Sequence, residues 1–109
     1  MNEPRLIRKY ANRRLYDTVR SRYVNLADVR NLIAEGGRVR VVEQSSSRDI
    51  TNSILLQVIG SMERDDDILL TTGFLTDLIR ALSRGSDLGL PERLQTALRN
   101  ALPTPVLHE

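Results

Sequence analysis

The chain of 109 residues contains no cysteine and no tryptophan, and its one histidine, His108, lies beside the last residue. Without cysteine there is no disulfide scaffold, no thiolate nucleophile and no cysteine-ligated zinc site. A single histidine at the terminus leaves no nucleophile and base of the kind that hydrolytic enzymes pair. The sequence therefore predicts a protein that is not an enzyme and that needs no cofactor.

Long apolar runs are also missing. No segment approaches the ~20 apolar residues of a membrane-spanning helix, and the first ten residues lack the apolar core of a signal peptide. We therefore expect a cytoplasmic protein without a membrane partner. Aromatic residues make up only 4%, so Leu, Ile and Val are expected to fill most of the core.

The net charge of +2 conceals an uneven distribution. Residues 1–48 hold 11 Arg and Lys against 5 Asp and Glu, which gives +6, whereas residues 49–109 hold 5 against 9, which gives −4. Fifteen of the sixteen basic residues are arginine, whose planar guanidinium suits phosphate and guanine. The N-terminal half is therefore expected to meet a polyanion.

Two stretches resemble each other at an offset of 26 residues, 14–33 over 40–59. Each copy reads as an extended segment, a polar turn, a short strand and an amphipathic helix. The predicted fold is α+β, with two repeated strand-strand-helix units forming a small antiparallel sheet backed by helices. The matched pairs are Arg14 with Arg40, Asp17 with Glu43, Ser21 with Ser47, Arg22 with Arg48, Val24 with Ile50, Leu32 with Val58 and Ile33 with Ile59.

Strands are predicted within 6–17, 22–25 and 39–44, and in each copy a helix follows the short second strand. Asn25 with Asp28 is a variant of the capping box, and two glycines at 36 and 37 end that helix. In the second copy Asp49 or Thr51 is the expected cap. The apolar residues expected to face the core are Leu26, Val29, Leu32 and Ile33, then Ile54, Leu55, Val58, Ile59 and Met62.

Beyond the acidic run 63–67 the pattern is purely helical. Residues 71–85, with Gly85 as a stop, and 90–103, between Pro91 and Pro103, predict a C-terminal helical hairpin. The acidic run lacks the ligand spacing of a calcium loop and is interpreted as a solvated linker. We therefore expect two domains, 1–64 and 65–109. The apolar faces of the hairpin, with Phe74 among them, favour docking on the first domain or homo-oligomerisation.

The stretch KYANRRLYDTVRSRY, residues 9–23, gathers five basic residues and all three tyrosines around one acid, Asp17. If residues 8–16 are extended, alternate side chains share a face: Arg8, Tyr10, Asn12, Arg14 and Tyr16 on one, Lys9, Ala11, Arg13 and Leu15 on the other. A ribbon with cations on both faces can hold phosphates while one face reads base edges.

The alternative is an ordinary edge strand whose charges prevent aggregation and whose Asp17 pairs with an arginine. Seven basic residues against two acids in residues 1–25 are more than this role requires, which favours nucleic acid. Each tyrosine taken singly is expected to pack in the core, because a chain without tryptophan has little other large aromatic material.

Residues 7–29 and 40–59 resemble the N-terminal DNA-binding domain of the polyhydroxyalkanoate synthesis repressors, bacterial regulators of storage-polymer accumulation. The matching signature runs from Lys9 to Asp17, continues through Ser21, Arg22 and Tyr23, and includes Asp49, Thr51 and the run 55–57. Ala11 stands where the family usually has proline. The resemblance is looser over the C-terminal helices.

The resemblance implies a repressor that binds promoter DNA of polymer-associated genes, such as those for granule coat proteins, and that leaves DNA on meeting nascent polyester. A homodimer or higher homo-oligomer on double-stranded DNA is the expected form. An alternative is a granule-binding or protein-interaction module without DNA readout. The predicted DNA-binding residues are Arg8, Lys9, Tyr10, Asn12, Arg13, Arg14, Tyr16, Arg20, Ser21 and Arg22, with Arg8, Lys9, Arg20 and Arg22 on phosphates and Asn12, Arg13 and Arg14 on bases.

Overall fold

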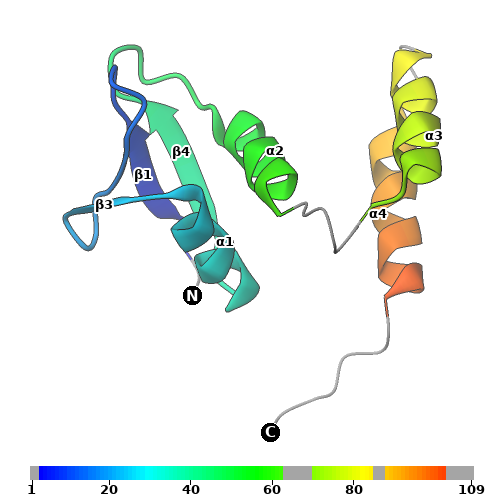
Figure 1. The fold of residues 1–109 in the computed structure, drawn as a ribbon, viewed down its shortest axis with the longest axis horizontal. Coiled ribbons are helices and arrows are strands. Elements are labelled where there is room, and N and C mark those ends of the chain that lie inside the picture. The colour runs from blue at the N-terminus through cyan, green and yellow to red at the C-terminus, as the bar shows by residue number, and fades with distance from the viewer. Residues whose placement is uncertain (1–2, 63–69, 85–87, 103–109) are drawn as a thin grey trace, which may run out of the picture. The chain divides into compact units, whose positions relative to one another are not determined.

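The computed structural model describes residues 3–62, 70–84 and 88–102 (Figure 1). The chain divides into two compact units, Met1–Leu69 and Leu70–Glu109, which are described separately. The acidic run 63–67, Gly85, Pro103 and His108 lie outside the described residues. The described residues form four strands and four helices, which confirms the α+β class.

The first unit is built on a four-stranded sheet in the order β3-β2-β1-β4. Strands β1 (Arg5–Lys9), β2 (Leu15–Asp17) and β3 (Arg22–Val24) form an antiparallel meander, and β4 (Val39–Glu43) pairs parallel to β1. The predicted antiparallel sheet is therefore wrong, and the sheet is mixed. Helix α1 (Leu26–Ala34) provides the crossover that a parallel pair requires, carrying the chain back to the open edge of β1.

Helix α1 begins and ends at the predicted signals. The Asn25 side chain accepts from the N–H of Asp28 (2.8 Å), and the Asp28 carboxylate accepts from the N–H of Asn25 (2.9 Å), which confirms the capping box. At the other end Gly36 has a φ of +101°, which favours glycine. The N–H groups of Gly36 and Gly37 bond the carbonyls of Ile33 and Leu32, which completes a Schellman motif.

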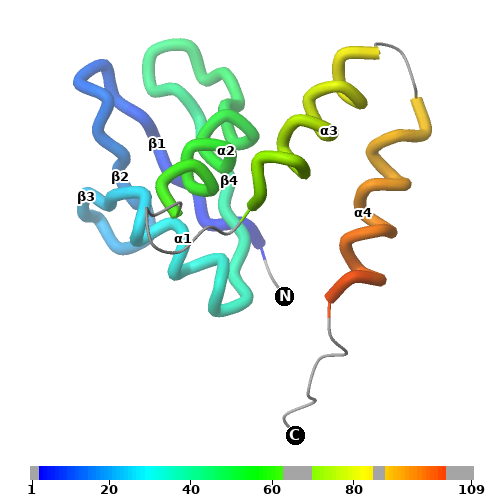
Figure 2. Tube along the Cα trace, turned by 45° about the vertical axis from the view of Figure 1, so that its right-hand side comes forward, coloured from blue at the N-terminus to red at the C-terminus, as the bar shows by residue number. Residues whose placement is uncertain are grey.

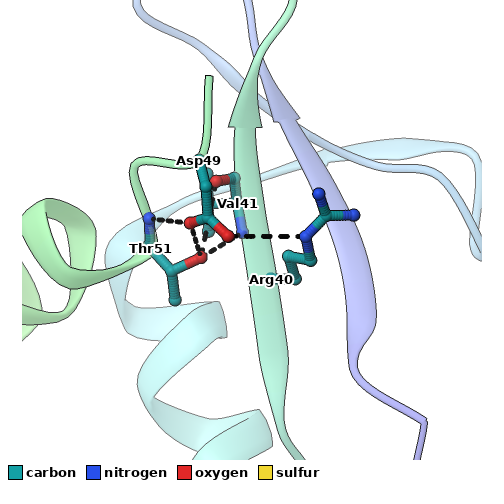
Figure 3. A network of polar contacts seen from close by, with 4 residues as sticks. All are labelled: Arg40, Val41, Asp49 and Thr51. Atoms are coloured by element: carbon teal, nitrogen blue, oxygen red, sulfur yellow. Dashed lines mark hydrogen bonds and ion pairs between the residues drawn. The ribbon is translucent and has the colours of Figure 1, made fainter. Parts of the chain in front are cut away.

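Helix α2 (Thr51–Ser61) begins differently from either predicted cap. Ile50 occupies the N-cap position and offers no side-chain bond, so neither Asp49 nor Thr51 is the N-cap residue itself. Instead the Asp49 carboxylate accepts from the N–H (2.9 Å) and the hydroxyl (2.6 Å) of Thr51, and from Arg40 Nε (3.4 Å) (Figure 3). These bonds hold the pKa of Asp49 below its ordinary value, and the two bonds from Thr51 lower it more than the bond from Arg40 does.

The core lies between the sheet and the two helices of the first unit. Ile7, Leu15 and Val41 of the sheet pack against Val29, Ile54 and Val58 of the helices. The prediction that Ile33 and Ile59 face the core is wrong, because Ile33 is 38% exposed and Ile59 is 51% exposed. Among the described residues no tyrosine belongs to this core, so that expectation is wrong as well.

The internal repeat is visible in the geometry of two loops. The N–H of Ser21 donates to the carbonyl of Asp17, and the N–H of Ser47 donates to that of Glu43, both at 2.8 Å. Ser21 (φ +56°) and Ser47 (φ +60°) are both left-handed. The second copy departs from the prediction at its second strand, which is reduced to a single bridge between Val42 and Asp49. The predicted strand-strand-helix repeat is therefore confirmed in part.

The second unit contains helices α3 (Thr72–Ser83) and α4 (Leu90–Ala101), at the predicted positions. The Thr71 hydroxyl accepts from the N–H of Phe74 (3.1 Å) and caps α3, and Pro91 lies in the first turn of α4. Neither helix has a buried residue, and Phe74 is 50% exposed. Across the described residues, neither these helices nor any other is long and apolar enough to cross a membrane.

Candidate nucleic-acid interface

The hairpin loop, residues 10–14, joins β1 to β2 through a tight turn. The N–H of Arg13 donates to the Tyr10 carbonyl (2.8 Å), and the N–H of Tyr10 donates to the Arg14 carbonyl (2.9 Å). Arg13 has a φ of +67°, in a position where hairpins of this kind usually place glycine. The loop therefore retains an exposed arginine at a site that strains its backbone by about 1 kcal/mol.

Asn12 helps to hold this loop. Its Oδ1 accepts from the N–H of Arg14 (3.1 Å) in an Asx turn. Bidentate recognition of adenine needs both the oxygen and the nitrogen of an Asn amide. In this conformation the Oδ1 atom of Asn12 is therefore already used within the loop.

One row of side chains crosses the face of the sheet that is turned away from the helices. Tyr23 pairs with Tyr16, Tyr16 with Arg8, and Arg8 with Val42, one residue from each strand. Because side chains alternate along a strand, this row lies opposite the core residues Ile7 and Leu15. We call this side the outer face.

The three tyrosines form one cluster on the outer face and beside the hairpin loop. The centroids of Tyr16 and Tyr23 lie 5.3 Å apart, and Tyr10 lies 6.0 and 6.3 Å from them, all in tilted or edge-to-face arrangements. The guanidinium carbon of Arg14 lies 3.8 Å from the centroid of Tyr23, a cation–π contact. The cluster therefore fixes Arg14 over an exposed aromatic surface.

A second loop, residues 18–21, lies at the opposite end of the sheet and carries Arg20. Asp17 organises it from beneath: its Oδ1 accepts from the N–H of Val19 (2.9 Å) and of Arg20 (3.1 Å), and its Oδ2 binds Arg5 (3.0 Å). Asp17 is only 2% exposed. Burial acts to raise the pKa of Asp17, but the N–H of Arg20, the Arg5 guanidinium and the N–H of Val19 together bring it below 3.8.

The basic residues of the first unit fall into two groups. Arg5 and Arg40 are paired, with Asp17 and Asp49. Within the described part of the chain, the predicted contact cations make no ion pair with a carboxylate. The alternative in which Asp17 pairs with an arginine is thus correct for Arg5 alone. Nine described cations of this unit make no such pair: the six predicted contact cations Arg8, Lys9, Arg13, Arg14, Arg20 and Arg22, and also Arg30, Arg38 and Arg48.

The structure does not place the ten predicted residues on one extended ribbon. Residues 10–14 turn back, so the predicted alternation of faces holds for Arg8 with Tyr16 and for Lys9 with Leu15 but fails within the loop. Arg20, Ser21 and Arg22 lie at the other end of β1, about 13 Å away for five residues of strand. The ten predicted residues do not include Tyr23, which pairs with Tyr16 across the polar turn that the sequence predicted between residues 17 and 22.

The described residues contain no cluster of three or more His, Asp or Glu side chains that could hold a metal ion. The predicted contact residues are mainly arginine, lysine, tyrosine and serine, whose side chains donate hydrogen bonds.

Comparison with known proteins gives one family and two close relatives. A family model described as PHB/PHA accumulation regulator DNA-binding domain matches residues 6–66. The chain is 48% identical over 80 residues to an uncharacterized protein in the phbA 5′ region of Thiocystis violacea, covering 73% of this chain and 58% of that protein. It is also 48% identical over 80 residues to an uncharacterized protein of Allochromatium vinosum, covering 73% of this chain and 52% of that protein. This chain thus spans little more than half the length of these relatives. No solved structure matches it.

Proposed function

The chain belongs to the family of PHB/PHA accumulation regulator DNA-binding domains, and we propose that it represses transcription by binding specific duplex sites near polymer-associated genes. The proposed target genes encode enzymes of polyester synthesis and granule coat proteins. The family supplies the biological setting. The contact surface is inferred from this chain's own residues.

The observation that carries the proposal is the contrast between paired and unpaired arginines. Arg5 and Arg40 each have a carboxylate partner, whereas the six predicted contact cations make no ion pair with a described carboxylate. Arg8 lies on the outer face, Arg13, Arg14 and Arg20 lie in the two loops, and the register places Lys9 and Arg22 at strand ends on the helix-facing side. Unpaired cations that lie near one another repel each other unless an anion binds between them. Duplex DNA supplies such anions at regular intervals along each strand.

We assign two kinds of contact to these cations. We propose that four cations hold backbone phosphates: Arg8 on the outer face, Arg20 and Arg22 at one end of the sheet, and Lys9 at the other end. Arg13 and Arg14, in the hairpin loop, are proposed to read base edges in the major groove, where arginine pairs bidentately with guanine. Asn12 is proposed to keep the loop in shape, since its Oδ1 already accepts from Arg14.

We further propose that α3 and α4 join copies of the chain. Both helices expose apolar side chains that a short isolated helix cannot cover, among them Ile79 at 63% and Leu98 at 59% exposed. Two copies related by a two-fold axis would present two hairpin loops to a pseudo-palindromic site. Polyester reaching the same apolar faces is the proposed signal that releases DNA.

The second candidate is an interaction module that binds granules or proteins without reading DNA. The same exposed apolar faces of α3 and α4 favour it. In that case the helices act alone, and the cations of the first unit are dispensable.

Selection from a random duplex library tests both candidates with one purified protein. The proposal predicts an enriched sequence that binds at least tenfold more tightly than a scrambled duplex of equal composition. It also predicts that Arg13→Ala and Arg14→Ala each weaken binding by about 1 to 3 kcal/mol and relax the preference, whereas Arg20→Ala weakens both duplexes alike. Recovery of no enriched sequence, together with granule binding unaffected by Arg13→Ala and Arg14→Ala, would favour the interaction module.

A further inference from the structure

Two loops lie side by side at the end of the sheet where β1 stops (Figures 1 and 2). One is the hairpin loop, and the other is residues 44–48, which we call the serine loop. The N–H of Gln44 donates to the carbonyl of Lys9 (2.8 Å), so the serine loop leaves β4 directly beside the hairpin loop. A hollow of about 210 Å³ between them is lined by Lys9, Tyr10, Ala11, Arg13, Glu43 and Ser45.

The serine loop is held in a defined shape. Besides the bond between Ser47 and Glu43, the Ser46 hydroxyl donates to Glu43 Oε1 (2.7 Å) and accepts from the N–H of Arg48 (3.2 Å). The left-handed backbone of Ser47 then turns the chain so that the N–H of Glu43 bonds the Arg48 carbonyl (2.9 Å). Arg48 is therefore presented from a fixed backbone.

The groups that this loop offers are those that bind phosphate. Arg48 is exposed and makes no ion pair with a described carboxylate. Its acidic neighbours bond other groups, Glu43 to Ser46 and Asp49 to Thr51 and Arg40. The exposed Ser45 hydroxyl has no hydrogen-bond partner among the described residues. Arginine and serine side chains are common donors to the phosphate oxygens of DNA.

The spacing of the two loops decides what they can reach together. They extend from neighbouring strands, which lie about 4.8 Å apart, whereas the major groove of DNA is about 12 Å wide. A duplex that is contacted by the hairpin loop therefore also lies within reach of the serine loop. Two cations on adjacent loops can then bind phosphates that border the same groove.

On the basis of the proposed function, we infer that the serine loop is a second contact with duplex DNA, in which Arg48 and Ser45 bind a backbone phosphate beside the bases met by Arg13. This extends the interface beyond residues 8–22 into the second copy of the internal repeat. Arg48 is the repeat equivalent of Arg22, so each copy supplies one phosphate contact directly after its left-handed serine.

Fluorescence anisotropy tests this inference. Binding of the full chain to the selected duplex and to its scrambled counterpart is measured at several salt concentrations. For each copy bound, Arg48→Ala is expected to weaken binding to both duplexes three- to tenfold and to reduce the salt slope by about 1. Arg48→Lys should bind within about twofold of the wild type, because a phosphate contact requires a point charge and not a planar fork. Thermal unfolding of each variant should match the wild type.

Arg30→Ala is the matched control, since it removes the same charge from α1. Among the described residues the Arg30 guanidinium bonds Asn31 alone, and the affinity of this variant should stay within twofold of the wild type. If Arg48→Ala binds as tightly as the wild type while Arg13→Ala is weakened, the inference is wrong and the proposed function stands. If neither variant is weakened, the proposed function fails too. If Arg48→Ala relaxes sequence preference and lysine does not restore binding, Arg48 reads a base and the phosphate assignment is wrong.

Discussion

The guanidinium of Arg14 lies over the ring of Tyr23, 3.8 Å from its centroid, and Tyr23 in turn packs edge-on against Tyr16. An arginine stacked on an aromatic ring loses fewer conformations on binding, because its plane is already set. We therefore propose that the tyrosine cluster supports Arg14 as a base-reading side chain, a role that agrees with its place outside the core.

Replacing Tyr23 tests this role. Tyr23→Phe keeps the ring and should preserve both affinity and the ratio of specific to scrambled binding. Tyr23→Leu removes the ring, and we expect it to lower that ratio three- to tenfold while leaving the salt slope unchanged, since no phosphate contact is lost. The measurement is anisotropy on the two duplexes. A purely structural role for Tyr23 would instead lower thermal stability and leave the ratio intact in the folded fraction.

Arg13 is expected to favour DNA binding at the expense of stability. Because its φ is +67°, Arg13→Gly should stabilise the protein by about 1 kcal/mol relative to Arg13→Ala, in which the strain remains. Both variants lack the guanidinium and should lose the same DNA affinity. Urea unfolding followed by tyrosine fluorescence, which reports only on the cluster of the first unit, measures the difference. Equal stabilities of the two variants would show that Arg13 is not left-handed in solution.

The buried Asp17 should control acid stability. Asp17→Asn removes the ion pair with Arg5 and is expected to cost about 2 to 3 kcal/mol at pH 7. The pKa of Asp17 is lower in the folded protein than its ordinary 3.8, so its stabilising contribution is complete above that value. The contribution is lost as the pH falls through the folded pKa.

The wild type and Asp17→Asn should therefore approach each other in unfolding free energy as the pH is lowered from 6 toward 2.5. Asp49→Asn provides the comparison, because Asp49 is exposed and water can replace its partners, so its cost should be smaller. A difference between wild type and Asp17→Asn that stays constant across this range would contradict the account of Asp17.

The two repeat loops should respond alike to glycine. Ser21→Gly and Ser47→Gly each remove a left-handed non-glycine residue and are expected to stabilise the protein by about 0.5 to 1 kcal/mol. The loops extend from opposite ends of the sheet, so the double variant should show the sum of the two effects. Chemical denaturation measures this. Unequal effects would mean that the two loops do not share the geometry of the repeat.

Much of this fold could be predicted from local signals. The capping box at Asn25, the glycine stop at Gly36 and the positions of the four helices each depend on a few neighbouring residues, and all appear in the structure. The offset of 26 residues likewise predicted matching loops. Such features need no knowledge of distant contacts.

What could not be predicted depended on pairings between distant residues or on rare backbone conformations. The parallel pairing of β1 with β4 is set by the path of α1, and no pattern within either strand indicates it. The turn at residues 10–14 was missed because Arg13 stands where a glycine would normally mark it. That omission led to the prediction of a single ribbon, whereas the structure has the hairpin loop, the loop 18–21 and the outer face. It also concealed the contact between Arg14 and Tyr23.

The central claim is that the unpaired cations of the first unit form a receptor for DNA phosphates. The most direct measurement is the dependence of the association constant on salt, for the wild type and for Arg8→Ala, Arg20→Ala and Arg22→Ala in turn. Five phosphate contacts in each copy, by Arg8, Lys9, Arg20, Arg22 and Arg48, predict a log–log slope of about −4 to −5 for each copy bound, reduced by about 1 per copy in each variant. A slope near zero, or one that none of these substitutions changes, would contradict the account.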